Sequence, residues 1–253
     1  MKRLLVICCA ALLVFACVNN YSRSDWEQEM LESALSGVLD LTVEFEAAYG
    51  KDDDYWFEVK KRGVAISMGN GYVLGLTHCF DTNSVIISGP FGSFKREIYP
   101  RNVKAHIGDQ ALDIIGSVDD IMLFKSATGF EEAYPFKWAD SDNLKIGDRV
   151  IVAGFPYMGN RNLRDGILSD TQPKNYPVGE DIKYHFLIST DCIGGDSGSP
   201  VLVMRWGKAK VAGLVQMVDS RGIMTFVLKS NYVLDCVKQI KEKQNASSVR
   251  QVS

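Results

Sequence analysis

The stretch Gly194-Gly195-Asp196-Ser197-Gly198-Ser199-Pro200 lies directly before an apolar run, Val201-Leu202-Val203. A serine flanked by glycines can sit on a tight turn with its hydroxyl exposed. The same glycines allow backbone N–H groups to turn toward a substrate carbonyl and to form an oxyanion hole. The stretch therefore predicts either a nucleophilic serine or, in a plainer interpretation, a glycine-rich hairpin.

Two further segments contain residues that could complete a catalytic site. His78 ends the apolar run Tyr72-Val73-Leu74-Gly75-Leu76-Thr77, where its imidazole can face a cleft. Asp120 comes directly before the apolar run Ile121-Met122-Leu123-Phe124, which is typical of a buried strand. Taken singly, a histidine at a strand end is more often structural, and an aspartate at a strand start usually serves turn chemistry.

Together the three segments resemble the trypsin-like serine peptidases, which use the same order of histidine, aspartate and serine. The resemblance implies that Ser197 is the nucleophile, His78 the base and Asp120 the orienting acid. It also implies that the N–H groups of Gly195 and Ser197 form the oxyanion hole. The α/β-hydrolases are excluded, because their order is serine, acid, histidine and their Gly-x-Ser-x-Gly elbow fails at Ser199.

Three other aspartates compete for roles near the triad. Asp119 is the rival acid and Asp113 a more distant one; Asp120 is preferred because the residue directly before Ile-Met-Leu occupies the family's position. Asp196 is not a triad member. By the resemblance, it could pair with a new amine after cleavage of an N-terminal segment, although the sequence shows no convincing activation site.

The second half of the chain is similar to bacterial HtrA-like enzymes. Residues 139–148 followed by 150–156 resemble the HtrA linker and the first strand of the second barrel, and residues 165–169 resemble the next hairpin. Residues 226–233 resemble the HtrA strand that leads into the terminal helix. The ending Gly198-Ser199-Pro200 is closer to the glutamyl endopeptidases. HtrA proteins usually carry PDZ domains after the protease, and here we expect only a helix and a short tail.

The resemblance also implies where a substrate would bind, through Asp191, Cys192, Gln216, Met217 and Val218. Asp191 lies six residues before Ser197, where trypsin-type enzymes keep an acid at the base of the pocket. The HtrA and glutamyl endopeptidase branches have the same aspartate but do not use it to recognise the substrate. The strand 214–218 lacks the glycine of a pocket for basic residues and the histidine of a pocket for glutamate. Met217 and Val218 therefore predict a narrow pocket that favours small or medium aliphatic side chains.

From Tyr55 onward, short runs of Val, Ile, Leu and Phe alternate with turn residues, as in an antiparallel sandwich or barrel. With the resemblance, this predicts an all-β fold of two six-stranded antiparallel β-barrels. We expect the protease domain over 51–244, with the first barrel over about 55–138 and the second over about 145–230. The candidate strands are 64–68, 72–76, 85–88, 121–125, 149–154, 185–189, 200–204, 210–216 and 224–228.

Helical spacing of apolar residues frames this β body. It predicts an N-terminal helical segment over 21–50 and a C-terminal helix over 231–243, followed by a flexible tail over 245–253. Packing of the first helix on the protease is the simpler interpretation, and a role in assembly as a homo-oligomer is the alternative. Size-exclusion chromatography of a chain that starts near Lys51 would separate the two.

The first twenty residues predict an export signal, because Lys2 and Arg3 precede an apolar run over 4–18. That run is shorter than the roughly 20 residues needed to cross a bilayer, and a short uncleaved anchor is the alternative. The segment Val14-Phe15-Ala16-Cys17 resembles the lipobox of bacterial lipoproteins, although Phe15 is unusual in that motif. The resemblance implies acylation of Cys17 and a periplasmic or cell-envelope protein with a membrane anchor.

Composition limits the cofactors and partners. The 253 residues include 28 basic and 31 acidic ones, for a net charge of −3, and no basic run favours a nucleic-acid partner. Three of the six cysteines lie in the signal, so Cys79, Cys192 and Cys236 can form at most one disulfide. The chain has no Cys-x-x-Cys pair and its three histidines are scattered, which predicts no metal and no cofactor.

The function implied is that of a serine endopeptidase that hydrolyses peptide bonds in proteins through an acyl-enzyme intermediate. Its role would be envelope protein quality control or the cleavage of one partner. The alternative is a catalytically silent binding or scaffolding protein with a protease fold. The presence of His78, Asp120 and Ser197 together argues against that alternative.

Overall fold

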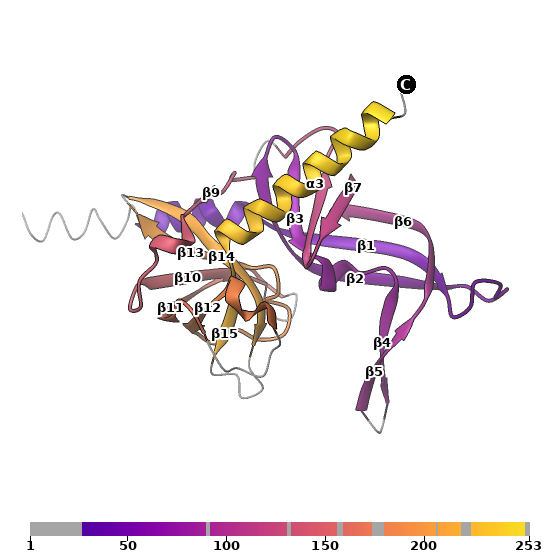
Figure 1. Cartoon of the computed structure of the whole chain (residues 1–253), viewed down its shortest axis with the longest axis horizontal. Coiled ribbons are helices and arrows are strands. Elements are labelled where there is room, and N and C mark those ends of the chain that lie inside the picture. The colour runs from indigo at the N-terminus through magenta and orange to yellow at the C-terminus, as the bar shows by residue number, and fades with distance from the viewer. Residues whose placement is uncertain are drawn as a thin grey trace, which may run out of the picture.

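The computed structural model describes residues 27–89, 92–130, 133–155, 159–173, 180–205, 207–218 and 224–250. The predicted signal over 1–20, with Cys17, lies outside these residues. The described chain forms two β-barrels side by side, with a long C-terminal helix running along both of them (Figure 1).

The first barrel closes six antiparallel strands in the order β1-β2-β3-β8-β7-β6. Its strands are β1 (Val38–Ala48), β2 (Phe57–Gly69), β3 (Tyr72–Leu76), β6 (Tyr99–Ile107), β7 (Gln110–Val118) and β8 (Ile121–Lys125). A short helix, α2 (Thr77–Phe80), follows β3 directly. A separate hairpin, β4 (Ser84–Gly89) and β5 (Gly92–Glu97), projects from the barrel (Figure 1).

The second barrel belongs to a seven-stranded sheet in the order β13-β10-β11-β12-β15-β14-β9. Pairing of β13 with β14 closes six of these strands into a ring, and β9 adds to β14 in parallel. The strands are β9 (Lys137–Trp138), β10 (Arg149–Gly154), β11 (Asn162–Asp170), β12 (His185–Ser189), β13 (Pro200–Arg205), β14 (Lys208–Val218) and β15 (Thr225–Lys229). The predicted double barrel of six-stranded sheets is confirmed.

The N-terminal part differs from the prediction. A helix covers residues 27–36 only, and the next residues form β1, so the prediction of a helical segment up to residue 50 was wrong. Leu39, Leu41, Val43, Phe45 and Ala47 alternate with outward-facing residues and pack inside the first barrel, which is the period of a strand. The first barrel thus begins at Val38 rather than near 55, and a chain starting near Lys51 would lack one of its strands.

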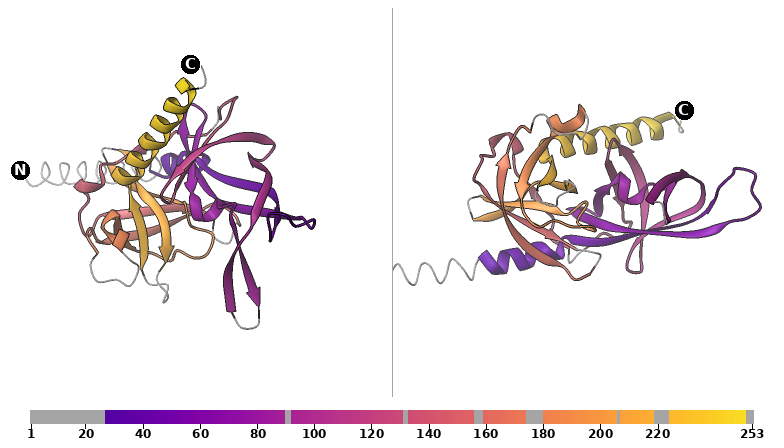
Figure 2. Two further views of the ribbon diagram at one scale, coloured as in Figure 1. Left: turned by 45° about the vertical axis from the view of Figure 1, so that its right-hand side comes forward. Right: turned by 90° about the horizontal axis from the view of Figure 1, so that it is seen from below.

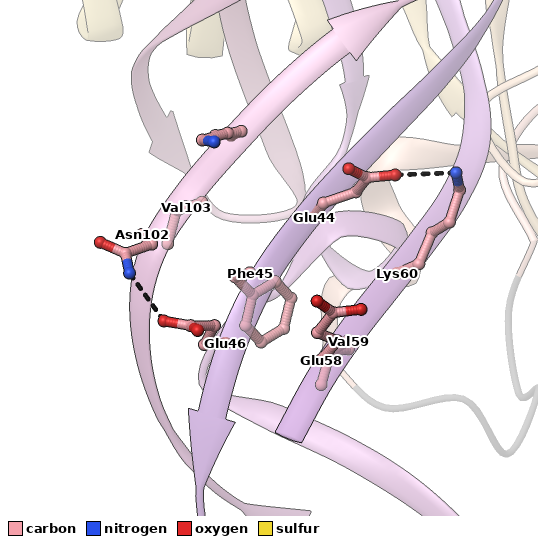
Figure 3. A pocket seen from close by; sticks show the side chains of 9 residues that line it. Glu44, Phe45, Glu46, Glu58, Val59, Lys60, Asn102 and Val103 are labelled. Atoms are coloured by element: carbon pink, nitrogen blue, oxygen red, sulfur yellow. Dashed lines mark hydrogen bonds and ion pairs between the residues drawn. The ribbon is translucent and has the colours of Figure 1, made fainter. Parts of the chain in front are cut away.

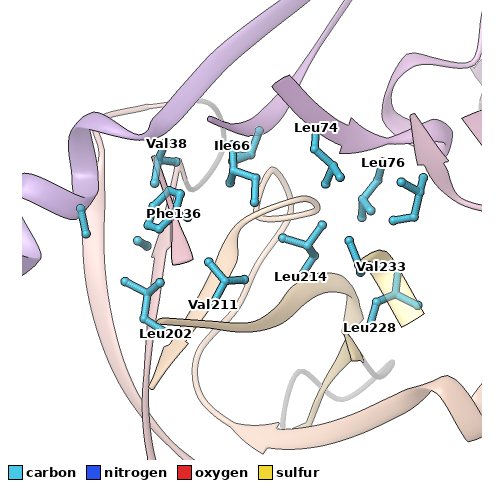
Figure 4. Close-up of a cluster of buried hydrophobic side chains, with 14 of the residues drawn as sticks. Val38, Ile66, Leu74, Leu76, Phe136, Leu202, Val211, Leu214, Leu228 and Val233 are labelled. Atoms are coloured by element: carbon cyan, nitrogen blue, oxygen red, sulfur yellow. The ribbon is translucent and has the colours of Figure 1, made fainter. Parts of the chain in front are cut away.

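A hydrophobic core joins the two barrels (Figure 4). Ile66, Leu74 and Leu76 of the first barrel face Leu214 and Leu228 of the second, and all of them are almost fully buried. Burial of each such side chain stabilises the fold by about 1.5–3 kcal/mol. This core fixes the two barrels against each other, so that loops from both can meet along their common edge.

The C-terminal helix, α3 (Ser230–Arg250), packs on β7 and β8 of the first barrel and on β14 of the second. It is visible along both barrels in two further views (Figure 2). It extends past the predicted end at residue 243 and includes residues 245–250 of the predicted tail; residues 251–253 lie outside the described part. None of the helices in the described ranges is long and apolar enough to cross a membrane.

Candidate active site

His78 and Asp120 are brought together by the pairing of β3 with β8. The register places Leu76 opposite Ile121, so that the residues beyond these two strand ends become neighbours. The backbone N–H of Thr77 donates to the carbonyl of Asp120 at 2.8 Å, and the N–H of His78 donates to Asp120 Oδ1 at 2.9 Å. His78 Nδ1 lies 2.8 Å from Asp120 Oδ2 and 3.1 Å from Oδ1. The carboxylate therefore holds His78 both at its backbone N–H and at its imidazole ring.

The rival acids lie elsewhere. Asp119 occupies the turn before β8 with a left-handed backbone (φ 50), and its Oδ2 accepts a hydrogen bond from Tyr232 of α3 at 2.6 Å. Asp113 is paired in register with Lys125, at the opposite end of β8 from His78. Of the three aspartates considered, Asp120 is the one in contact with the imidazole.

Ser197 lies on the loop that precedes β13, and this loop reaches β2 of the first barrel. The loop is fixed by a hydrogen bond from Gly198 N to the Val215 carbonyl at 2.8 Å and by one from Val215 N to the Ser199 carbonyl at 2.9 Å. Gly198 has φ 89, and a Cβ at this position would lie 2.4 Å from the carbonyl oxygen of Val64 in β2. Only glycine allows the nucleophile loop to approach the first barrel this closely.

The hydroxyl of Ser197 donates to the carbonyl oxygen of Gln216 at 3.3 Å. Among the hydrogen bonds of the described residues, none joins Ser197 Oγ to the His78 ring. The Cys79 thiol, next to His78 in the chain, lies 3.9 Å from the Ser197 carbonyl oxygen, which places the two segments against each other. In unliganded sites catalytic hydrogen bonds are often long or misaligned and tighten only around substrate.

Gln216 has a role that the sequence did not indicate. It was expected to bind substrate, whereas its side chain points to the catalytic groups: Nε2 donates to Asp120 Oδ2 at 2.8 Å. Its Oε1 is hydrogen-bonded to Nε2 of His185, which is buried on β12. A chain of polar contacts thus runs from His185 through Gln216 and Asp120 to His78.

The pKa values of His78 and Asp120 are shifted by these contacts. Burial opposes a charge on His78, but the hydrogen bond from its ring to Asp120, the contact with Cys79 and the charge of Asp120 together raise the pKa of His78 above its usual 6.5. Burial acts in the opposite sense on Asp120, and its hydrogen bonds with His78 and Gln216 outweigh it, so the pKa of Asp120 is lowered. The contacts therefore favour the charged form of each group, the imidazolium of His78 and the carboxylate of Asp120.

The other predicted substrate-binding residues lie in three different environments. Cys192 is 2% exposed and packs in the core of the second barrel, where burial raises the pKa of its thiol to about 11. Asp191 is exposed, and its carbonyl accepts from Arg164 at 2.8 Å. Met217 and Val218 are half-buried at the end of β14, opposite β15, and their effect on specificity stays a prediction. Cys79, Cys192 and Cys236 are all free thiols.

A hollow on the outer face of the first barrel is separate from these groups (Figure 3). Two of its acidic side chains have partners: Glu44 pairs with Lys60 at 2.7 Å, and Glu46 binds Arg101 at 2.8 Å. Within the described ranges, no group of three or more His, Cys, Asp or Glu side chains is placed to hold a metal ion.

The double barrel, with a histidine–aspartate pair from one barrel facing a serine loop from the other, defines the class of chymotrypsin-fold peptidases. The sequence profile of the trypsin-like peptidase domain matches residues 62–209, more than half of the chain. The chain belongs to this trypsin-like peptidase family. No curated protein matches the sequence.

Solved protease structures share the fold. The HtrA-type protease AlgW with a decapeptide superposes with a TM-score of 0.59 at 18% sequence identity, over 84% of this chain and 66% of AlgW. The Rv3671c protease from M. tuberculosis in its active form gives a TM-score of 0.55 at 18% identity, over 83% of each chain. Its inactive form gives 0.55 at 18% identity, over 83% of this chain and 92% of that one.

Proposed function

We propose that the protein is a serine endopeptidase in which Ser197 is the nucleophile, His78 the general base and Asp120 the orienting acid. Ser197 Oγ attacks the carbonyl carbon of a peptide bond while Nε2 of His78 takes the hydroxyl proton. The same proton passes to the leaving amine as the C–N bond breaks and an acyl-enzyme forms. Water, activated by His78 in turn, then releases the acyl group and restores the serine.

The observation that carries this proposal is the position of the imidazole. Because the carboxylate of Asp120 lies 2.8 Å from Nδ1, that nitrogen carries the proton in the neutral ring. The lone pair of the neutral ring is then on Nε2, the atom that must accept a proton from Ser197. The serine hydroxyl, which donates to Gln216 in the unliganded protein, has to rotate toward Nε2 when substrate binds.

The N–H groups of Gly195 and Ser197 complete the proposed site as the oxyanion hole. Among the described residues, neither group donates to a backbone carbonyl, whereas Asp196 N donates to the Ile193 carbonyl at 3.1 Å and Gly198 N to the Val215 carbonyl. The two N–H groups are therefore available to a developing negative charge. Each such donor contributes about 3 kcal/mol to stabilisation of the transition state.

The first test is labelling of the purified protein with a fluorophosphonate. Attack by an activated serine on phosphorus expels fluoride, and we expect one adduct, located on Ser197 by peptide mass spectrometry. Heat-unfolded protein and Ser197→Ala should take up no label. An adduct on another serine, or equal labelling of Ser197→Ala, would contradict the assignment.

The same experiment separates a second candidate, a catalytically silent binding protein. The hydrogen bond of Ser197 to Gln216 instead of His78 favours this alternative, because a hydroxyl in that state is not activated. Folded protein that resists the probe both alone and with added peptide would support the silent form.

We further propose that the protein is exported and anchored to the cell envelope through an acylated Cys17, where it acts in protein quality control. The charged start, the short apolar run and the lipobox-like ending support this. In cells fed an alkyne fatty acid, we expect the wild-type chain to be labelled and found with membranes. Cys17→Ser should lose both properties and Cys9→Ser, in the same segment, should keep them. Membrane association that persists unchanged in Cys17→Ser would refute the lipid anchor.

A further inference from the structure

Asp196 directly precedes the proposed nucleophile and is completely buried, with 0% of its side chain exposed. The sequence suggested that a new N-terminal amine could neutralise it. Instead, both its oxygens accept from the guanidinium of Arg164 on β11: Nη1 lies 2.6 Å from Oδ2, and Nη2 lies 2.5 Å from Oδ1. The backbone N–H of Ile193 donates to Oδ2 at 2.8 Å. The carboxylate is therefore fully satisfied within the second barrel.

Arg164 is itself 15% exposed and holds both ends of the loop that leads to Ser197. Besides its paired hydrogen bonds to Asp196, its Nη1 donates to the carbonyl oxygen of Asp191 at 2.8 Å. A bidentate pair of this kind fixes both distance and angle, which a lysine ammonium cannot do. The strand that carries Arg164 is anchored through its register with Val152 of β10.

The neighbouring backbone leaves space for the ion pair. A Cβ on Gly154, at the end of β10, would lie 2.8 Å from Asp196 Oδ1 and 2.4 Å from Ser199 Oγ. Any side chain at this position would collide with the Ser199 hydroxyl and with the carboxylate of Asp196.

The ion pair determines the orientation of the proposed oxyanion donors. Asp196 shares a peptide group with Ser197, whose N–H is one donor, and it directly follows Gly195, whose N–H is the other. A shift of Asp196 would therefore disturb the backbone that carries both donors. Gly195 has φ 95, a conformation that an unrestrained loop has no need to keep. Loss of the Arg164 contact would free this turn while leaving His78 and Asp120 in place on the other barrel.

We propose that Arg164 is the positioning residue of the peptidase, which holds the Asp196 loop and its oxyanion donors in the active arrangement, so that no newly cleaved N-terminus is needed for activity. This inference rests on the proposed peptidase function. Arg164 would then take the place of the new N-terminal amine that, by the resemblance, could have paired with Asp196.

The test is the Arg164→Ala variant with and without added guanidinium chloride, at concentrations below those that unfold the protein. We expect kcat to fall about 10²–10³-fold, the effect of losing an oxyanion donor, with a smaller change in KM. Guanidinium, which can fill the space left by the side chain, should restore much of kcat, whereas sodium chloride at equal ionic strength should not. A merely structural role would not give this selective rescue.

Arg149→Ala provides the matched control. Arg149 lies on β10 and forms exposed ion pairs with Glu27 and Asp165, both at 2.7 Å, so its loss should leave kcat unchanged and insensitive to guanidinium. If Arg164→Ala does not fold, Arg164→Lys, which keeps the charge but not the paired geometry, should fold and show an intermediate kcat.

The outcomes separate this inference from the function on which it rests. Failure of the wild-type protein to label with fluorophosphonate would overturn the function. An unchanged kcat in Arg164→Ala, or a loss that guanidinium does not reduce in a variant with wild-type near-ultraviolet circular dichroism, would overturn the role of Arg164. So would intact mass spectra showing that, among chains already processed at Cys17, only those trimmed further accept the label.

Discussion

Replacing Ser197 by alanine is expected to lower kcat/KM for a peptide substrate by about 10⁶-fold, and replacing His78 by alanine should cost about as much. The two side chains act as a unit, because the serine is not nucleophilic until the imidazole accepts its proton. The double variant should therefore be no slower than either single one. A residual rate about 10³–10⁴-fold above that in water should remain, supplied by the oxyanion donors and by substrate binding.

The measurement is a double-mutant cycle on kcat/KM, with thermal melts to show that each variant is folded. His106→Ala is the matched control, because the ring of His106 on β6 is hydrogen-bonded to the Gly108 carbonyl at 2.8 Å rather than to Asp120 or Ser197. Additive losses in the double variant would mean that Ser197 and His78 do not act in one step and would refute the proposed mechanism.

The sequence predicted the second barrel better than the first. Each predicted strand of the second barrel is present. These strands form short apolar runs, because their side chains are buried both inside the barrel and in the core between the two barrels. The strands β6 and β7 were not predicted, because most of their side chains are polar or exposed. The first strand, β1, was mistaken for a helix because Val38, Leu39 and Leu41 satisfy either period, and only its pairing with β2 decides between them.

For the site, local motifs were sufficient to find the proposed catalytic residues but not the residues that hold them in place. His78, Asp120 and Ser197 each lie in a recognisable segment. Gln216 and Arg164 do not, since their contacts arise from strand register and from loops that meet only after folding. The opposite error concerns Cys192, whose position in the chain suggested a substrate contact and whose thiol is buried in the core of the second barrel.

Replacing Asp120 by asparagine is expected to lower kcat about 10⁴-fold near neutral pH while changing the shape of the site little. The carboxylate accepts from His78 N, His78 Nδ1 and Gln216 Nε2, and one amide cannot replace all three acceptors. If the amide N–H faces the ring, it donates to Nδ1 and forces the proton onto Nε2. The neutral ring then has no lone pair for the proton of Ser197.

The pH dependence should change as well. The general base must be neutral, and Asp120 raises the pKa of His78, so kcat/KM of the wild-type enzyme should rise through a midpoint above 6.5. Without the carboxylate, burial of the ring lowers its pKa and the midpoint should fall. The raised pKa of His78 also affects the stability of the fold. It stabilises the folded state below pH 6.5, and this contribution is lost as the pH rises through the folded-state pKa.

Asp119→Asn is the control for this prediction, since it makes the same chemical change one residue earlier in the chain. Its carboxylate bonds to Tyr232 of α3 rather than to the imidazole, so kcat and the midpoint of the pH profile should stay at wild-type values. The comparison decides which acid orients His78. A wild-type profile for Asp120→Asn together with a 10⁴-fold loss for Asp119→Asn would exchange their roles, and equal small losses would mean that neither carboxylate sets the tautomer of the base.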